Sequence, residues 1–158
     1  MSRSTRSASF ATVALLLAST QLSSSARPEP GDACSLFTKE DAAAALGEPA
    51  TGPKSVAPPP SGGVKVTGCG YEGSGINRLQ VNLTRLSPEA LPMYRGICAQ
   101  QKQDGLAGLG EVACWYQDKH EELHVIKGAA FLSIQLRRKG DPTEPIKTLM
   151  KKALGNLK

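Results

Sequence analysis

The sequence predicts an α+β domain: an antiparallel sheet of about five strands with helices packed against it. Two observations indicate this class. Segments in which apolar and polar residues alternate recur between residues 64 and 137, and this period of two is typical of half-buried strands. Segments with apolar residues at helical spacing precede, interrupt and follow them. The expected order of elements is therefore α-β-β-α-β-β-β-α.

The first element of the domain is a short helix. Thr38 can cap its free N–H groups, with Asp41 in the capping-box position. Residues 41–46 are strong helix formers, and Gly47 supplies the left-handed residue that commonly ends a helix. The residues that follow, 49–63, contain Pro and Gly throughout, which predicts a loop.

The next two elements are strands over residues 64–72 and 76–86. In the first strand Val66 has the opposite parity to Cys69, so Gly68 between them predicts a bulge that resets the register. In the second strand apolar and polar residues alternate in the order Leu79, Gln80, Val81, Asn82, Leu83 and Thr84.

A second helix is expected to begin at Ser87-Pro88. Residues at helical spacing form its inward stripe: Leu91, Tyr94, Ile97, Cys98 and Gln101. The glycines within residues 105–110 predict a supple loop. This loop is not a dinucleotide-binding fingerprint, because no strand leads into it and no helix follows.

Three further strands and a helix complete the order. The strands are expected over residues 111–117, 123–127 and 129–137. The last helix is expected to start at Asp141-Pro142. Its apolar residues fall on one face: Ile146, Leu149, Met150, Ala153, Leu154 and Leu157.

Residues 1–26 are typical of a secretory signal peptide. Arg3 and Arg6 form the positive start, residues 10–18 the apolar centre, and Ser24-Ser25-Ala26 the small-residue cleavage site. The apolar run is shorter than the ~20 residues that span a bilayer. No cysteine directly follows it, where a lipid anchor would be attached. We therefore expect a secreted or periplasmic protein without a membrane span.

The exported part is expected to divide into a mobile lead, residues 27–33, and a single α+β domain, residues 34–158. Without 26 of its 158 residues the chain keeps 132, enough for one ordinary domain. It then has seventeen basic and fourteen acidic residues, a net charge of only +3. The densest basic run, Arg137-Arg138-Lys139, has no interleaved aromatic residues, so we expect a solvated strand end and no nucleic-acid partner.

All four cysteines lie in the exported part: Cys34, Cys69, Cys98 and Cys114. An even number in an oxidising compartment predicts two disulfides. Three pairings are possible, and we favour Cys34–Cys69 with Cys98–Cys114 because each bond joins neighbouring predicted elements. The chain has no CxxC pair, so a thioredoxin-like redox site or a zinc knuckle has little support.

One stretch matches a catalytic signature. His120, Glu121 and His124 form the HExxH pattern of zinc peptidases, and Glu144 follows where some families place a third ligand. In those enzymes a helix brings both imidazoles to one ion, and the glutamate polarises the bound water. The match would make the chain a metallopeptidase if residues 118–127 were helical.

The residues around this match predict a hairpin instead of a helix. Gly128 lies only four residues past His124, and Val125-Ile126 are β-branched. Residues 118–122 are polar and separate two apolar runs, which is the usual composition of a hairpin tip. We therefore predict no metal site and no cofactor.

Other catalytic patterns are weaker still. The chain has no GxSxG elbow, no P-loop and, once the disulfides form, no free cysteine. The neighbouring carboxylates of Glu121 and Glu122 would point to opposite faces of a strand, so we interpret them as solvating residues. The sequence predicts no catalytic residues, and thus a protein that is not an enzyme.

A resemblance extends over most of the exported part. Cys34-Ser35-Leu36-Phe37-Thr38, residues 43–47 and Cys69-Gly70-Tyr71 together resemble bacterial exported and lipoprotein domains of unknown function. Residues 108–113 and 123–128 continue the resemblance. It implies a PsbP-like α/β sandwich, a Cys34–Cys69 disulfide and no established catalytic residues. The lipid-anchor cysteine of such proteins is missing here, and Cys98 and Cys114 look like an added pair.

These observations indicate a monomeric, non-catalytic envelope domain that binds a protein, a polymer or a small ligand through a loop or a sheet face. Two alternatives remain. One is a zinc peptidase that uses residues 120–124. The other is a secreted hydrolase inhibitor that inserts the loop of residues 49–63.

Overall fold

The computed structural model describes residues 31–56 and 64–157, so the predicted signal peptide and most of the predicted lead lie outside it. The described chain contains a six-stranded antiparallel sheet with the strand order β1-β2-β3-β6-β5-β4. The strands are β1 (Thr51–Ser55), β2 (Lys65–Glu72), β3 (Arg78–Arg85), β4 (Val112–Trp115), β5 (Glu122–Lys127) and β6 (Ala130–Arg137). The predicted α+β class is confirmed, with one strand more than expected.

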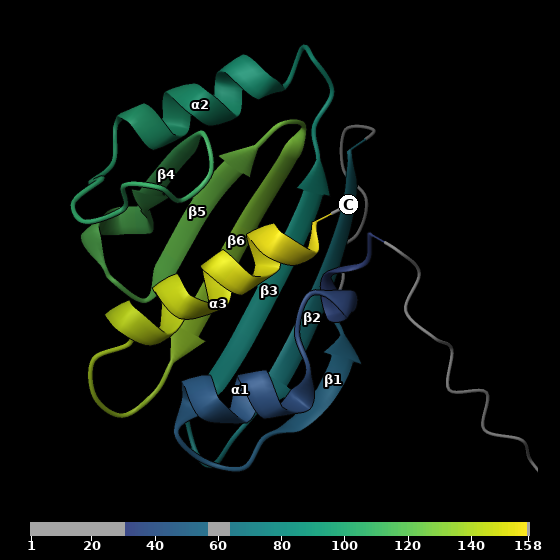
Figure 1. The fold of residues 1–158 in the computed structure, drawn as a ribbon, viewed down its shortest axis with the longest axis vertical. Helices are drawn as coiled ribbons and strands as arrows, with labels where there is room; N and C mark the ends of the chain where they lie inside the picture. The colour runs from purple at the N-terminus through teal and green to yellow at the C-terminus, as the bar shows by residue number, and fades with distance from the viewer. Residues whose placement is uncertain (1–30, 57–63, 158) are drawn as a thin grey trace, which may run out of the picture.

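Three helices pack against this sheet: α1 (Lys39–Leu46), α2 (Leu91–Ala99) and α3 (Thr143–Asn156). Two short 3-10 turns accompany them, η1 (Ala33–Ser35) before α1 and η2 (Tyr116–Asp118) after β4. Helices α1 and α3 cross the same face of the sheet, whereas α2 lies at one end of the molecule, near β4 (Figure 1).

The core lies between the sheet and the two helices α1 and α3. Every second residue of the central strands points into it, as the alternation in the sequence predicts. In β3, β5 and β6 the fully buried residues on this face are Leu79, Val81, Leu83, Leu123, Val125, Leu132, Ile134 and Leu136. Helix α3 covers them with the predicted apolar stripe, of which Ile146, Leu149, Met150, Ala153 and Leu154 are buried. Each large apolar side chain buried here contributes roughly 1.5–3 kcal/mol.

The sixth strand, β1, corrects the prediction of a loop over residues 49–63. Residues 51–55 pair with β2, although Gly52 and Pro53 are poor strand formers. Two features make this possible. Strand β1 is at the edge of the sheet, where the missing N–H of Pro53 can be tolerated, and the register shifts between Thr51 and Lys54. Gly52 is required because a Cβ there would lie 2.8 Å from the carbonyl oxygen of Gly70.

The predicted bulge at Gly68 is wrong. Strand β2 pairs with β3 without a break from Lys65 to Glu72. Val66 and Cys69 therefore simply face opposite sides of the sheet. Gly68 is needed for a different reason: a Cβ there would lie 2.9 Å from Oδ1 of Asn82 and 3.1 Å from the carbonyl oxygen of Val56. Because Gly68 has no Cβ, the backbone that follows β1 and the side chain of Asn82 in β3 can both lie close to it.

Most element boundaries differ from those predicted by one or two residues, and two differences have a clear physical reason. Helix α2 begins at Leu91 rather than at Ser87-Pro88, and residues 87–90 form a turn before it. Pro92 then falls in the first helical turn, where a missing N–H costs no intrahelical bond. Strand β4 ends at Trp115, two residues early, because the chain enters η2, in which Gln117 has a positive φ of 54°.

The start of α1 is as predicted. The hydroxyl of Thr38 accepts a hydrogen bond from the backbone N–H of Asp41 at 3.2 Å, and the carboxylate of Asp41 accepts one from the N–H of Thr38 at 2.9 Å. Lys152 of α3 also donates to Asp41, at 2.6 Å. Burial raises the pKa of Asp41, but the hydrogen bonds from Lys152 and Thr38 outweigh it and hold the pKa below its usual value.

We expect Thr38→Ala to lower the free energy of unfolding by about 1 kcal/mol, because the N-terminal N–H groups of α1 lose their cap. Urea unfolding followed by circular dichroism would measure the loss. Thr38→Ser keeps the hydroxyl and is the matched control. An equal loss in both variants would show that the cap does not carry the effect.

Both favoured disulfides are confirmed. Cys34 of η1 is bonded to Cys69 of β2, with the two Cα atoms 5.0 Å apart, and Cys98 of α2 is bonded to Cys114 of β4, with 5.4 Å between the Cα atoms. The first bond holds the segment before α1 against the sheet. The second holds α2. Within residues 31–56 and 64–157, no helix is long and apolar enough to cross a bilayer.

Candidate functional site

The second face of the sheet, opposite α1 and α3, is the polar one. Because facing residues of antiparallel strands share a face, register assigns Asn82, Ser133 and His124 to one row across β3, β6 and β5. Gln80, Gln135 and Glu122 form the next row. We call this surface the open face, because among the described helices α1 and α3 lie on the other side.

Helix α2 covers one end of the open face. Its Tyr94 ring contacts the ring of Phe131 in β6, with 4.8 Å between the centroids. Its Cys98 is bonded to Cys114, which faces the same side of the sheet as His124. Cys98 is the only buried residue of this helix. The position of α2 therefore depends largely on one disulfide, one aromatic contact and the ion pair of Arg95 with Glu111.

A hollow of about 390 Å³ lies on the open face below α2. We call it the open-face hollow. It is lined by side chains from α2, η2 and four strands: Val66, Asn82, Thr84, Tyr94, Ile97, Tyr116, Glu122, His124, Phe131 and Ser133. Three of these polar residues are largely buried, although the open face carries no described helix over its centre: Thr84, His124 and Ser133.

Glu122 is the centre of a hydrogen-bond network in this hollow. Its Oε1 accepts from Nε2 of His124 at 2.8 Å and from the hydroxyl of Ser133 at 3.4 Å. Its Oε2 accepts from the side-chain amide of Gln135 at 3.3 Å. Asn82 extends the network by donating to Ser133 at 3.4 Å. Since a carboxylate can only accept, its bond fixes Nε2 of His124 as a donor.

The network leaves acceptors unused. A carboxylate offers about four acceptor positions, and the contacts of Glu122 occupy three of them. The side-chain oxygen of Asn82 is buried and has no hydrogen-bond partner among the described residues. The hydroxyl of Ser133 and the imidazole of His124, in contrast, are both directed at Glu122. The hollow thus keeps an unused acceptor position at Glu122, beside the hydroxyls of Thr84, Tyr94 and Tyr116, which can donate or accept.

Aromatic rings form a continuous wall of the hollow. The ring of His124 stacks on Tyr116 with 4.9 Å between centroids and meets Phe131 edge-on at 5.0 Å. Phe131 in turn contacts Tyr94 of α2. Aromatic walls around a few converging polar groups are typical of small-molecule sites.

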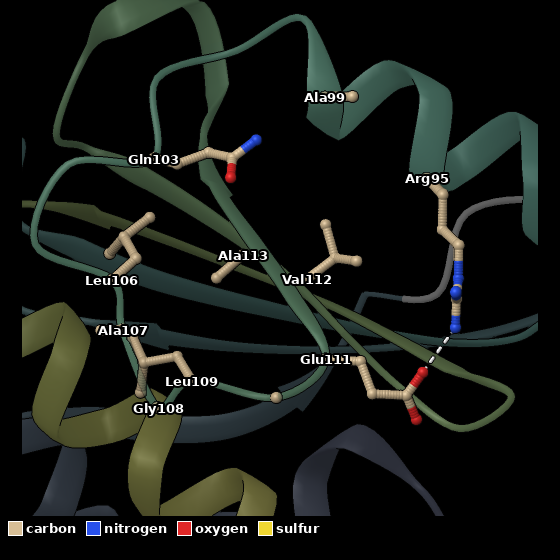
Figure 2. A pocket seen from close by; sticks show the side chains of 11 residues that line it. Arg95, Ala99, Gln103, Leu106, Ala107, Gly108, Leu109, Glu111, Val112 and Ala113 are labelled. Carbon is tan, nitrogen blue, oxygen red and sulfur yellow. Dashed lines mark hydrogen bonds and ion pairs between the residues drawn. The ribbon is translucent and has the colours of Figure 1, made fainter.

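A second hollow, of about 560 Å³, lies on the other side of α2, between that helix and the loop before β4. Figure 2 shows Gln103 and Leu106 of the loop facing Val112 and Ala113 of β4. The charged groups at its rim, Arg95 and Glu111, are paired with each other. Because it lacks converging polar side chains with free capacity, this hollow is the weaker candidate.

The HExxH match lies across a hairpin, as predicted. His124 is in strand β5 and faces the open-face hollow. His120 lies in the turn, where its ring packs on Trp115 at 4.7 Å and its Nδ1 is 3.2 Å from the hydroxyl of Thr143 at the start of α3. The two imidazoles therefore contact opposite sides of the sheet. Glu144 forms an ion pair with Lys147 at 3.0 Å.

No group of three or more His, Cys, Asp or Glu side chains within the described ranges could hold a metal ion. The contacts of His120 and His124 thus do not provide the geometry that a zinc peptidase requires.

Glu122 lines the hollow, although its place in the sequence was interpreted as that of a solvating residue. Glu121 lies in the turn before β5 and is exposed. The side chain of Glu122, in contrast, faces the open-face hollow and not bulk water. The signal was present in the parity of β5: Glu122 and His124 alternate with the buried Leu123 and Val125.

Comparisons of the chain with known protein families, with characterised proteins and with solved structures found no match.

Proposed function

We propose that this chain is an exported, monomeric, non-catalytic domain that binds a small ligand in the open-face hollow. The observation that carries this proposal is the convergence of Glu122, His124 and Ser133 inside an aromatic-walled hollow of about 390 Å³. Polar groups of this kind orient a ligand, and the surrounding rings supply contact area. The volume suits a small molecule better than a protein surface or a polymer.

The arrangement of these polar groups supports binding rather than catalysis. A nucleophilic serine requires a base within hydrogen-bond reach. Here the hydroxyl of Ser133 lies 3.4 Å from the carboxylate of Glu122, beyond the ~2.6–3.2 Å that separates an activated nucleophile from its base, and Nε2 of His124 donates to the same carboxylate. Ser133 and His124 thus share an acceptor instead of forming a nucleophile–base pair.

Export is supported by the disulfides and by the residues before the domain. Two disulfides persist in oxidising compartments. The features of a signal peptide in residues 1–26 lie outside the described residues and support the proposal from sequence alone. Of the loop proposed for an inhibitor, residues 57–63 are also outside, and residues 51–55 belong to β1.

The proposal is tested by blocking the hollow from its rim. Ile97 lines the hollow on α2 and is 42% exposed, so Ile97→Trp should fill the entrance without disturbing the core. In a screen of small fragments by protein-observed NMR, we expect hits that shift the amide signals of Phe131 and Ser133. The Ile97→Trp variant should bind those fragments with an affinity that is lower by about tenfold or more, since the larger side chain occupies the volume that they need.

Met93→Trp is the matched control, because Met93 is an exposed residue of the same helix that does not line the hollow. It should leave the affinities unchanged. If fragments bind elsewhere, or bind equally well to Ile97→Trp, the open-face hollow is not the site.

A further inference from the structure

We infer that the ligand of the open-face hollow is a small organic cation with an ammonium, amidinium or guanidinium group, held by Glu122 and the aromatic wall. This inference rests on the proposed function and names its ligand class.

The charge of the hollow is the first argument. Among the residues that the structure describes, Glu122 is the only acidic side chain that lines it, and no Lys or Arg side chain does. Arg78 and Arg137 lie on the same face, but register places them one row beyond Gln80 and Gln135. They border the hollow at that end rather than line it. A cation that enters meets a carboxylate without a competing Lys or Arg.

Hydrogen-bond capacity is the second argument. Glu122 keeps an unused acceptor position, and the hydroxyls of Thr84, Tyr94 and Tyr116 that line the hollow can accept as well as donate. An ammonium, amidinium or guanidinium group only donates, so it matches these acceptors. Its bond to a carboxylate is stronger than a neutral one, because both partners are charged. A sugar hydroxyl would use the acceptors but would bring no positive charge to the carboxylate, which pairs only with the imidazole of His124 among the described basic side chains.

The aromatic wall is the third argument. Tyr94, Tyr116 and Phe131 line the hollow around Glu122. The faces of Tyr and Phe rings attract cations within about 6 Å of the ring centre. The carboxylate and the rings therefore favour the same kind of ligand, whereas an anion would be repelled by both.

Three probes of nearly equal size and shape test this inference: benzamidine, which is a cation, benzamide, which is neutral, and benzoate, which is an anion. Each is titrated into the protein, and the amide signals of Phe131, Ser133 and Gln135 are followed by NMR. We expect benzamidine to bind about tenfold more tightly than benzamide and benzoate to bind more weakly still. Added salt should weaken the binding of benzamidine alone among the three probes, because it screens the attraction between the cation and the carboxylate.

Glu122→Gln removes the charge and keeps the shape. It should lower the affinity for benzamidine about tenfold and change the affinity for benzamide by no more than about twofold. Glu72→Gln is the matched control, because Glu72 is on the same face at the far end of β2, paired with Lys54. It should change neither affinity. Amide spectra of both variants establish that they are folded.

The outcomes separate this inference from the proposed function. If benzamide or benzoate binds in the hollow as tightly as benzamidine, the hollow is a ligand site but its ligand is not a cation. If benzamidine binds equally to Glu122→Gln, the carboxylate does not recognise it and the inference is wrong. If neither the three probes nor the fragment screen shifts signals of the hollow, both proposals fail.

Discussion

Replacing Cys34 and Cys69 together by Ala is expected to lower the free energy of unfolding by about 4 kcal/mol. The bond closes a loop across a sequence separation of 35, and closing such a loop removes roughly that much entropy from the unfolded chain. A domain of this size has a total stability of roughly 5–15 kcal/mol, so the loss is a large share. Urea unfolding of the oxidised protein and of the variant would measure it.

The loss should concentrate in the segment before α1. The bond holds this segment against β2, where the N–H of Ala33 donates to Thr67 at 3.0 Å and the buried hydroxyl of Tyr71 donates to the carbonyl of Phe37 at 3.1 Å. Burial raises the pKa of the Tyr71 hydroxyl, so it remains a donor at neutral pH. Hydrogen exchange should therefore quicken in residues 33–37, and a stability change below 1 kcal/mol would contradict the prediction.

Much of the fold could be predicted from the sequence because its elements carry local signals. The alternation of Leu79, Val81 and Leu83 fixes which side of β3 is buried, and the stripe of α3 fixes which side covers it. The capping box of Thr38 and Asp41 determines where α1 begins. Such signals depend only on nearby residues, so they can be recognised without knowledge of the tertiary structure.

Strand β1 could not be predicted because its signal is not local. Gly52 and Pro53 have low strand propensity, and the segment is extended because β2 offers it a free edge. The role of Gly68 is hidden for the same reason. Only the approach of Val56 and Asn82 shows that a side chain at this position would clash.

Only part of the candidate site could be predicted from the sequence. Parity alone places Glu122 and His124 on one side of β5. That Ser133 and Asn82 face them depends on the register of three strands. That Tyr94 closes the hollow depends on the way the Cys98–Cys114 bond folds α2 back over the sheet. The HExxH match lies in a stretch that contributes to the candidate site. The acidic residue that lines the hollow, however, is the one next to the glutamate of the match.

Replacing Cys98 and Cys114 together by Ala is expected to lower the free energy of unfolding by about 3 kcal/mol, because the closed loop spans a separation of only 16. The effect on the site should exceed the effect on stability. Helix α2 has one buried residue, Cys98, and no side-chain cap at its N-terminus. Without the bond, the contact of Tyr94 with Phe131 and the exposed ion pair of Arg95 with Glu111 are left to hold it.

Helix α2 should then open locally while the sheet stays folded, since the core lies on the other face. Hydrogen exchange is expected to quicken in residues 91–99 but not in β3 or β6, and benzamidine affinity should fall by tenfold or more as the wall with Tyr94 and Ile97 is lost. The Cys34/Cys69 variant is the control: it loses more stability, yet α2 and the hollow should be retained. Protection of residues 91–99 that is equal to wild type would show that α2 packs without its disulfide, and that the hollow is a property of the sheet alone.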